Sequence, residues 1–282
     1  MVVARERSTK SVTVPLESGA FLRNLTAGDV NGDGAADLVV QARKEDEGQS
    51  LAMLYTGGPD GPSHKIYLPD SDTAAIGDID KDGYGDMVVG DSYQVSALGG
   101  RVTVIPGGPN AISDTKPGAS FHQETAGVPG ASESGDAFGG ALALGDTNGD
   151  GYRDLVIGAP GEDVDTSADA GAVTILRGSA SGITVTGAKS LTQNSTGIPG
   201  SVEKGDRFGS ALWLSDTNKD GRADLAASAV GEAAPGESVR SGAVWRILGS
   251  STGLTSTGSL AISPDDVGRA WDDTTFGAAL TG

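Results

Sequence analysis

An internal repeat is the feature that most constrains how this chain can fold. Residues 125–142 read TAGVPGASESGDAFGGAL and align without a gap to residues 195–212, STGIPGSVEKGDRFGSAL. Extending the register predicts four units, at about 21–69, 70–137, 138–207 and 208–275, with partial units at 10–20 and 276–282. A fixed period of this kind predicts a repeat architecture, in which each unit buries its faces against its neighbours.

Each unit contains four short runs typical of β-strands. In the third unit they are Ala141–Leu144, Asp154–Gly158, Ala172–Leu176 and the more polar Ser190–Gln193. They are rich in Val, Ile, Leu and Thr and are bounded by turn-forming residues. Gly-rich turns separate the third run from the fourth, which predicts a hairpin there. We therefore expect an all-β chain, a β-propeller built of four-stranded antiparallel blades. A parallel β-helix is disfavoured, because its repeats are much shorter.

The two ends of the chain predict an incomplete ring. Residues 10–16 are similar to the last strand of a blade, and Phe276 to Gly282 are similar to a first strand. We expect residues 1–282 to form one propeller domain or a segment of a longer one. Association with a further chain is one way in which such a propeller would be completed.

Every unit also carries one aspartate-rich loop that fits D-x-[DN]-x-D-G-x-x-D. Calcium takes six to eight oxygen ligands, and alternate side chains of a tightly turned loop converge on one point. The glycine at position 6 permits the sharp turn. Side chains at positions 1, 3, 5 and 9 and the carbonyl at position 7 are the predicted ligands of about four Ca²⁺ sites. They are Asp29, Asn31, Asp33, Ala35 and Asp37; Asp78, Asp80, Asp82, Tyr84 and Asp86; Asp146, Asn148, Asp150, Tyr152 and Asp154; and Asp216, Asn218, Asp220, Arg222 and Asp224.

Three other interpretations of these loops are disfavoured. Asp, Asn and Gly also form ordinary turns, but four matches at one place in four units disfavour a turn without metal. Mg²⁺ keeps several waters, so a shell made of protein oxygens favours Ca²⁺. An EF-hand needs a glutamate at position 12 and flanking helices. That position holds Val40, Val89, Ile157 and Ala227, and the flanks are apolar and β-branched.

Charge and composition restrict the ligand classes. The net charge of −18 argues against nucleic acid, whose phosphates require clustered Lys and Arg. The four loops hold 13 of the 38 acidic residues, so bound Ca²⁺ would relieve part of the self-repulsion. No cysteine is present, which excludes disulfides and thiolate metal sites. No apolar run is long enough to span a membrane.

The third unit resembles the FG-GAP repeat of integrin α chains and related bacterial proteins. Phe138-Gly139, the loop 146–154 and Gly158-Ala159-Pro160 match the whole pattern. The other units match in part, because the FG pair is replaced by Phe21-Leu22 or Asp70-Ser71, and the GAP triplet also varies. The resemblance implies a seven-bladed propeller with mainly structural calcium between the first two strands of some blades, and ligand binding elsewhere on the surface.

We therefore expect an extracellular or cell-surface binding or scaffold module whose partner is a protein or a carbohydrate. The alternative is the non-catalytic part of a calcium-dependent secreted hydrolase or polysaccharide lyase. No catalytic constellation is recognisable around either His64 or His122. The acidic pairs Glu133/Asp136 and Glu203/Asp206 are interpreted as turns. The aromatic candidates for ligand contact are Phe208, Trp213, Trp245 and Trp271, beside Arg207 and Arg240, although large aromatics in blades more often pack between sheets.

Overall fold

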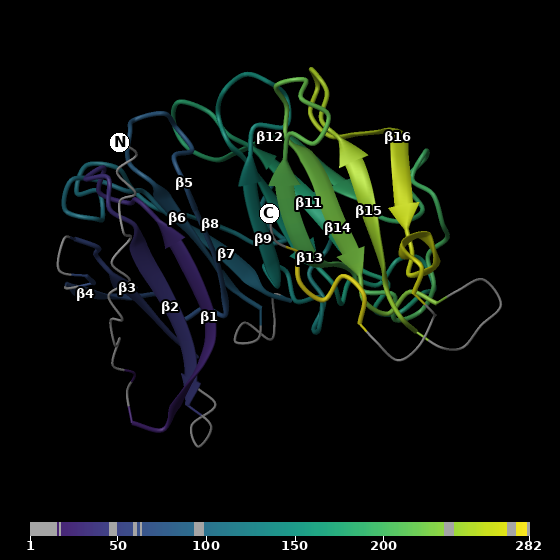
Figure 1. Ribbon diagram of the computed structural model, residues 1–282, viewed down its shortest axis with the longest axis horizontal. Helices are drawn as coiled ribbons and strands as arrows, with labels where there is room; N and C mark the ends of the chain where they lie inside the picture. The colour runs from purple at the N-terminus through teal and green to yellow at the C-terminus, as the bar shows by residue number, and fades with distance from the viewer. Residues whose placement is uncertain are drawn as a thin grey trace, which may run out of the picture.

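A computed structural model gives the fold of residues 16, 18–44, 50–58, 61–62, 64–92, 99–233, 240–269 and 275–280. Within these residues the chain is all-β, with four sheets of four antiparallel strands each (Figure 1). One short 3₁₀ helix, η1 (Asp265–Val267), follows the last strand. No helix in the described part of the chain is long and apolar enough to cross a membrane.

Consecutive strands pair in chain order within each sheet, so every sheet is a simple meander. Sheet 1 contains β1 (Ala20–Gly28), β2 (Asp37–Lys44), β3 (Ser50–Tyr55) and β4 (Lys65–Leu68); sheet 2 contains β5 (Thr73–Gly77), β6 (Asp86–Asp91), β7 (Arg101–Ile105) and β8 (Ala119–Phe121). Sheet 3 contains β9 (Ala141–Gly145), β10 (Asp154–Ala159), β11 (Ala172–Arg177) and β12 (Thr184–Leu191); sheet 4 contains β13 (Phe208–Ser215), β14 (Asp224–Ala229), β15 (Ala243–Leu248) and β16 (Thr255–Ile262).

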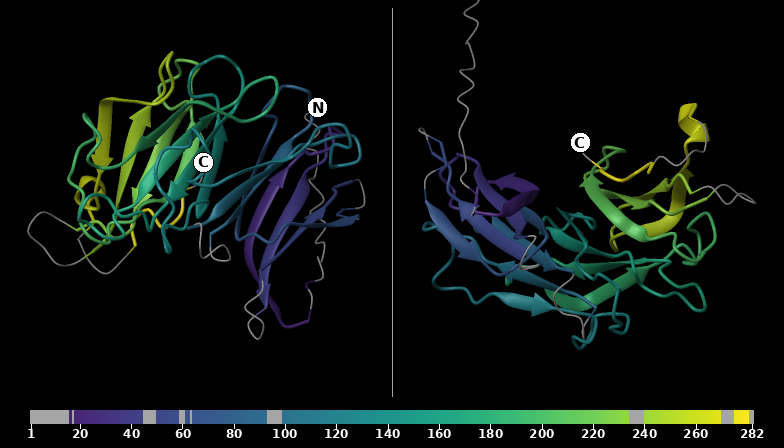
Figure 2. Two further views of the ribbon diagram at one scale, coloured as in Figure 1. Left: turned by 180° about the vertical axis from the view of Figure 1, so that it is seen from behind. Right: turned by 90° about the horizontal axis from the view of Figure 1, so that it is seen from below.

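The sheets follow one another as propeller-like blades. Their first strands lie side by side in series, β1 against β5, β5 against β9 and β9 against β13. Seen from below, the sheets form an arc with the purple first sheet at one end and the yellow-green fourth sheet at the other (Figure 2). This arrangement brings the corresponding loops of successive sheets to the same edge.

Apolar side chains between neighbouring sheets form the core. Strands β6 and β10 are buried at every position, which explains the apolar runs Met87-Val88-Val89 and Leu155-Val156-Ile157 within them. Phe208 and Trp245 of sheet 4 have ring centroids 5.5 Å apart in an edge-to-face arrangement. They belong to one buried cluster with Val156, Val173 and Ile175 of sheet 3, and this cluster is the contact between the two sheets. The outer strand β12 has no buried residue, as its polar sequence requires. Burial between sheets therefore decides which runs are apolar throughout.

Glycine pairs let neighbouring sheets approach closely. A Cβ at Gly158 would overlap the carbonyl oxygen of Gly209 in the next sheet, and a Cβ at Gly90 would overlap that of Gly139. The glycines of the FG pairs and of the GAP segments thus face each other across the blade contacts. Between sheets 1 and 2 the same place is taken by Gln41 and Ser71, whose side chains are 3.2 Å apart in a buried hydrogen bond.

Two predicted strands differ from the structure. The fourth strand of sheet 3 runs from Thr184 to Leu191, so the expected run Ser190–Gln193 overlaps only its end. Residues 275–280 form no strand; instead Phe276 N donates to Ser241 O at 2.6 Å, against sheet 4. Phe21, expected in the place of an FG phenylalanine, is 54% exposed, whereas Phe138 and Phe208 are fully buried. The expected N-terminal partial strand falls mostly outside the described residues.

Candidate metal-binding loops

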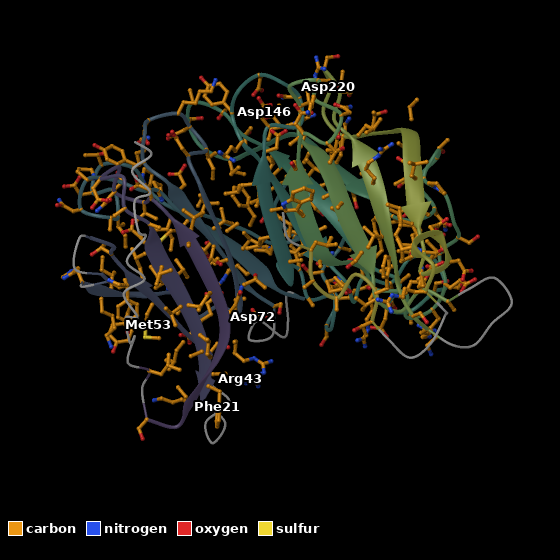
Figure 3. All side chains as sticks on the ribbon, in the orientation of Figure 1. Phe21, Arg43, Met53, Asp72, Asp146 and Asp220 are labelled. Atoms are coloured by element: carbon orange, nitrogen blue, oxygen red, sulfur yellow. The ribbon has the colours of Figure 1, made fainter. Side chains whose placement is uncertain are left out.

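The four aspartate-rich loops each connect the first strand of a sheet to its second. We call them loop 1 (29–37), loop 2 (78–86), loop 3 (146–154) and loop 4 (216–224). Asp146 and Asp220 lie at the upper edge of the molecule, far from Phe21 and Arg43 at the lower edge (Figure 3). Strands flank every loop, as the sequence predicted, and no EF-hand helix is present beside any of them.

The carboxylate at position 1 organises each loop. Its Oδ2 accepts a hydrogen bond from the backbone N–H of the glycine at position 6, at 2.6–3.1 Å in all four loops. Those glycines have φ between 82° and 91°, a conformation that disfavours any side chain. The glycine at position 6 is therefore required by the turn itself.

Positions 3 and 5 fold toward each other. In every loop the backbone N–H of position 5 donates to the side-chain Oδ1 of position 3, at 2.8–3.3 Å. The Oδ1 of position 5 accepts the N–H of position 7 in turn, at 2.8–2.9 Å. A carboxylate oxygen has two lone pairs, so an oxygen that accepts one of these bonds can also contact a cation.

The aspartate at position 9 has a second role that the sequence did not indicate. Its carboxylate is buried, and one oxygen accepts the N–H of position 2 in the same loop, at 2.7–3.2 Å. The other oxygen accepts the N–H of a glycine that follows the third strand of the sheet, at 2.6–3.1 Å. This aspartate therefore ties the loop to the connection between the third and fourth strands.

The glycines that follow the third strand were a signal for this contact. Gly57, Gly107, Gly178 and Gly249 stand at the same place in the four repeats. A Cβ at any of them would press on the carbonyl oxygen of the residue that precedes the position-9 aspartate. The sequence showed glycine-rich turns there, and the structure shows that close backbone approach requires them.

Loop 2 brings three carboxylates together. One oxygen each of Asp78, Asp80 and Asp86 lies within 4.8 Å of the others, and in the described residues this is the only such group of three. Burial, with the nearby Asp80 and Asp82 adding, raises the pKa of Asp86 to about 6. Hard carboxylate oxygens at this spacing fit a divalent cation such as Ca²⁺. Loops 1, 3 and 4 have asparagine at position 3 and one carboxylate fewer.

Neighbouring loops are also joined across the blade contacts. Gly85 N donates to Asp29 O at 3.0 Å, which joins loop 2 to loop 1, and Ala223 N donates to Asp146 O at 2.7 Å, which joins loop 4 to loop 3. Lys81 of loop 2 lies over the ring of Tyr152 in loop 3, 4.8 Å from its centroid. Ordering one loop therefore constrains the next blade as well.

The other residues that the sequence offered for ligand contact or catalysis lie in the core, in turns or at the surface where the structure describes them. Trp245 is 1% exposed and its indole N–H donates to Pro199 O at 2.7 Å, so it belongs to the core. Glu133 N and Glu203 N donate to Asp136 and Asp206 respectively, each at 2.6 Å, which is the turn expected from the sequence. His64 is exposed and His122 is partly buried near the end of β8. Trp213 is partly buried, and Trp271 lies outside the described residues.

Known proteins are similar in sequence to parts of this chain. The FG-GAP repeat profile matches residues 138–176. Integrin alpha-5 of Xenopus laevis is 30% identical over 161 residues, which is 51% of this chain and 15% of that protein. Phosphatidylinositol-glycan-specific phospholipase D of Rattus norvegicus is 35% identical over 130 residues, 46% of this chain and 15% of that protein. The chain thus spans about 15% of the length of the curated relatives it matches.

Among solved structures, Bacillus licheniformis rhamnogalacturonan lyase PL11 aligns over 84% of this chain and 51% of that chain. The TM-score is 0.46 and the sequence identity is 12%. A likeness at that TM-score says nothing about activity.

Proposed function

We propose that this chain, which matches the FG-GAP repeat over residues 138–176 and is similar to integrin alpha chains, is a calcium-binding propeller segment that acts as a binding or scaffold module. The observation that carries this proposal is the carboxylate cluster of loop 2, which stands in register with three loops of the same backbone design. Calcium would be held by the position-1, 3, 5 and 9 side chains and the position-7 carbonyl of each loop. Its role would be structural, because the loops join the first two strands of every blade.

The test of calcium binding is a thermal melt of the purified chain in EDTA, in excess Mg²⁺ and in millimolar Ca²⁺, together with calorimetric titration. A ligand at 100 times its dissociation constant stabilises the folded state by about 2.7 kcal/mol per site. Several sites should thus raise Tm by many degrees, and Mg²⁺ should do so less. An unchanged Tm and no heat of binding would refute the proposal and favour loops that are turns only.

The proposal also covers location and partners. Loops of this type suit millimolar calcium, which favours an extracellular or cell-surface module that recognises a protein or a carbohydrate. The four blades would form one domain over residues 1–282, or part of a longer propeller whose ring further blades complete. Sedimentation velocity tests whether a second copy of the chain supplies the further blades. In that case the chain should self-associate, and the association should depend on calcium.

The second candidate is a non-catalytic part of a calcium-dependent secreted enzyme. It is favoured by the similarity to a protein whose name denotes a phospholipase D, although the chain covers 15% of that relative. Incubation of the purified chain with glycosylphosphatidylinositol and polysaccharide substrates tests what both candidates share, which is the absence of a catalytic site in this chain. Turnover by the chain alone would overturn both, because each assigns it no catalytic site.

A further inference from the structure

Loop 2 differs from the other loops at position 3. In loops 1, 3 and 4 an asparagine stands there, and its Nδ2 donates to the Oδ2 of the aspartate at position 5. The donor and acceptor atoms are 3.0, 2.8 and 3.2 Å apart in the three loops. This hydrogen bond closes the loop between two predicted ligands.

Loop 2 has Asp80 at that place, which offers no amide donor. Instead, Lys116 Nζ bridges the two carboxylates, with ion pairs to Asp80 Oδ2 and, at 2.6 Å, to Asp82 Oδ2. The lysine therefore takes the place of the missing amide group. It also offsets the fourth carboxylate of this loop, so that the four carboxylates of loop 2 together with Lys116 carry the same charge as the three carboxylates of each of the other loops.

Lys116 reaches loop 2 from the connection between β7 and β8. That connection runs from 106 to 118 and is longer than its counterparts at 178–183 and 249–254. Ser113 holds it in shape, because its Oγ accepts the N–H of Lys116 at 3.1 Å and its own N–H donates to Pro106 O at 2.9 Å. The extra length of this connection is thus ordered and presents the lysine to the loop.

The side chain of Lys116 is accessible to solvent. It is 36% exposed and lies at the edge of a cavity of about 370 Å³ that Asp80 and Asp86 also line. Its side chain therefore has solvent on one side. An ammonium group in this position can yield to a divalent ion.

We propose that Lys116 is a built-in cation that competes with calcium at loop 2. It orders the loop when no metal is bound, and its charge lowers the affinity of this loop for calcium. The inference rests on the proposed calcium function and adds to it, since it assigns one loop a weaker, lysine-controlled site. A metal ion held by the same carboxylates meets the positive charge of Nζ directly, so the two cations oppose each other.

The test uses K116M, the matched control K81M and the double variant D80N/K116M. Lys81 belongs to the same loop but contacts Tyr152 and Asp150 O, so K81M removes the same charge without removing the bridge. We expect K116M to bind calcium at one site roughly tenfold more tightly, because one unit charge roughly 5 Å from a divalent ion is removed. In EDTA, K116M should lower Tm by about 2–4 °C. In EDTA the double variant should have the Tm of wild type, because an amide at position 80 again donates to Asp82.

The outcomes separate this inference from the proposed function. If wild type binds calcium but K116M binds it no more tightly than K81M does, Lys116 does not compete and the inference is overturned while calcium binding stands. If no variant binds calcium, both fail. If the double variant does not regain the Tm of wild type in EDTA, the lysine does not replace the amide.

Discussion

Replacing Asp224 by asparagine should destabilise the protein even when no metal is bound. Asp224 is 1% exposed and accepts backbone N–H groups from Gly249 at 2.9 Å and from Thr217 at 3.1 Å. Asparagine has nearly the same shape, but one of the two oxygens becomes an NH₂ group that cannot accept. One of the two N–H groups is then buried without an acceptor.

The magnitude follows from the bonds that are lost. A hydrogen bond to a charged group contributes about 1.5–3 kcal/mol, and a buried donor without a partner costs about 1–3 kcal/mol. These two terms overlap, so we expect a loss of about 3 kcal/mol. In a chain of this size 1 kcal/mol corresponds to about 2–4 °C, which predicts a fall in Tm of about 6–12 °C.

The assay is a thermal or urea denaturation of D224N and wild type in EDTA, with D220N as the matched control. Asp220 is in the same loop and receives the same substitution, but its side chain is 37% exposed. In EDTA we expect D220N to change stability by about 0.5 kcal/mol or less, while both variants weaken calcium binding. Equal stability of D224N and wild type in EDTA would refute the role of the position-9 aspartate as a tie between loop and blade.

Three further changes test one partly buried carboxylate and the packing of the core. Burial, with nearby Asp206 adding, raises the pKa of Glu232 to about 7 from 4.5, so its contribution to stability is present at low pH and is lost as the pH rises through about 7. E232Q should flatten the decline of the urea midpoint between about pH 5 and about pH 8 in EDTA, and an unchanged slope would contradict this. Phe208→Ala removes a ring that is fully buried against Trp245 in the core cluster shared by sheets 3 and 4, and should cost about 3–5 kcal/mol in urea denaturation. A loss below about 1 kcal/mol would mean that the ring is not packed in that cluster. Gly158→Ala should cost at least about 2 kcal/mol, because the added Cβ overlaps the Gly209 carbonyl oxygen, whereas a neutral result would show that the sheets separate without cost.

Local sequence patterns predicted most of the elements. The first three strands of the third unit begin at Ala141, Asp154 and Ala172 as expected, because apolar runs bounded by turn residues specify them locally. The fourth strand was predicted too late. It is a polar strand at the edge of its sheet and pairs with one neighbour, β11. Its limits therefore depend on that pairing rather than on its own composition.

The candidate site was predictable for a similar reason. Positions 1 to 7 of each loop bond to one another over a few residues, and a short motif therefore records them. The partners of position 9 and of Asp80 are distant in sequence, at Gly107 and Lys116 respectively for loop 2. The loop motif itself does not record these contacts, although the glycine that follows each third strand marks the one made by position 9.

The sequence by itself determined the repeat, the four strands of each unit, and loops whose oxygens suit calcium, since each of these depends on residues close together in the chain. Only the tertiary structure decided which carboxylates meet. It buried Asp37, Asp86, Asp154 and Asp224 under the glycine turns and brought Lys116 to loop 2. The physical reason is that burial and ion pairing depend on how separate strands and blades pack, and packing brings together residues that no local pattern relates.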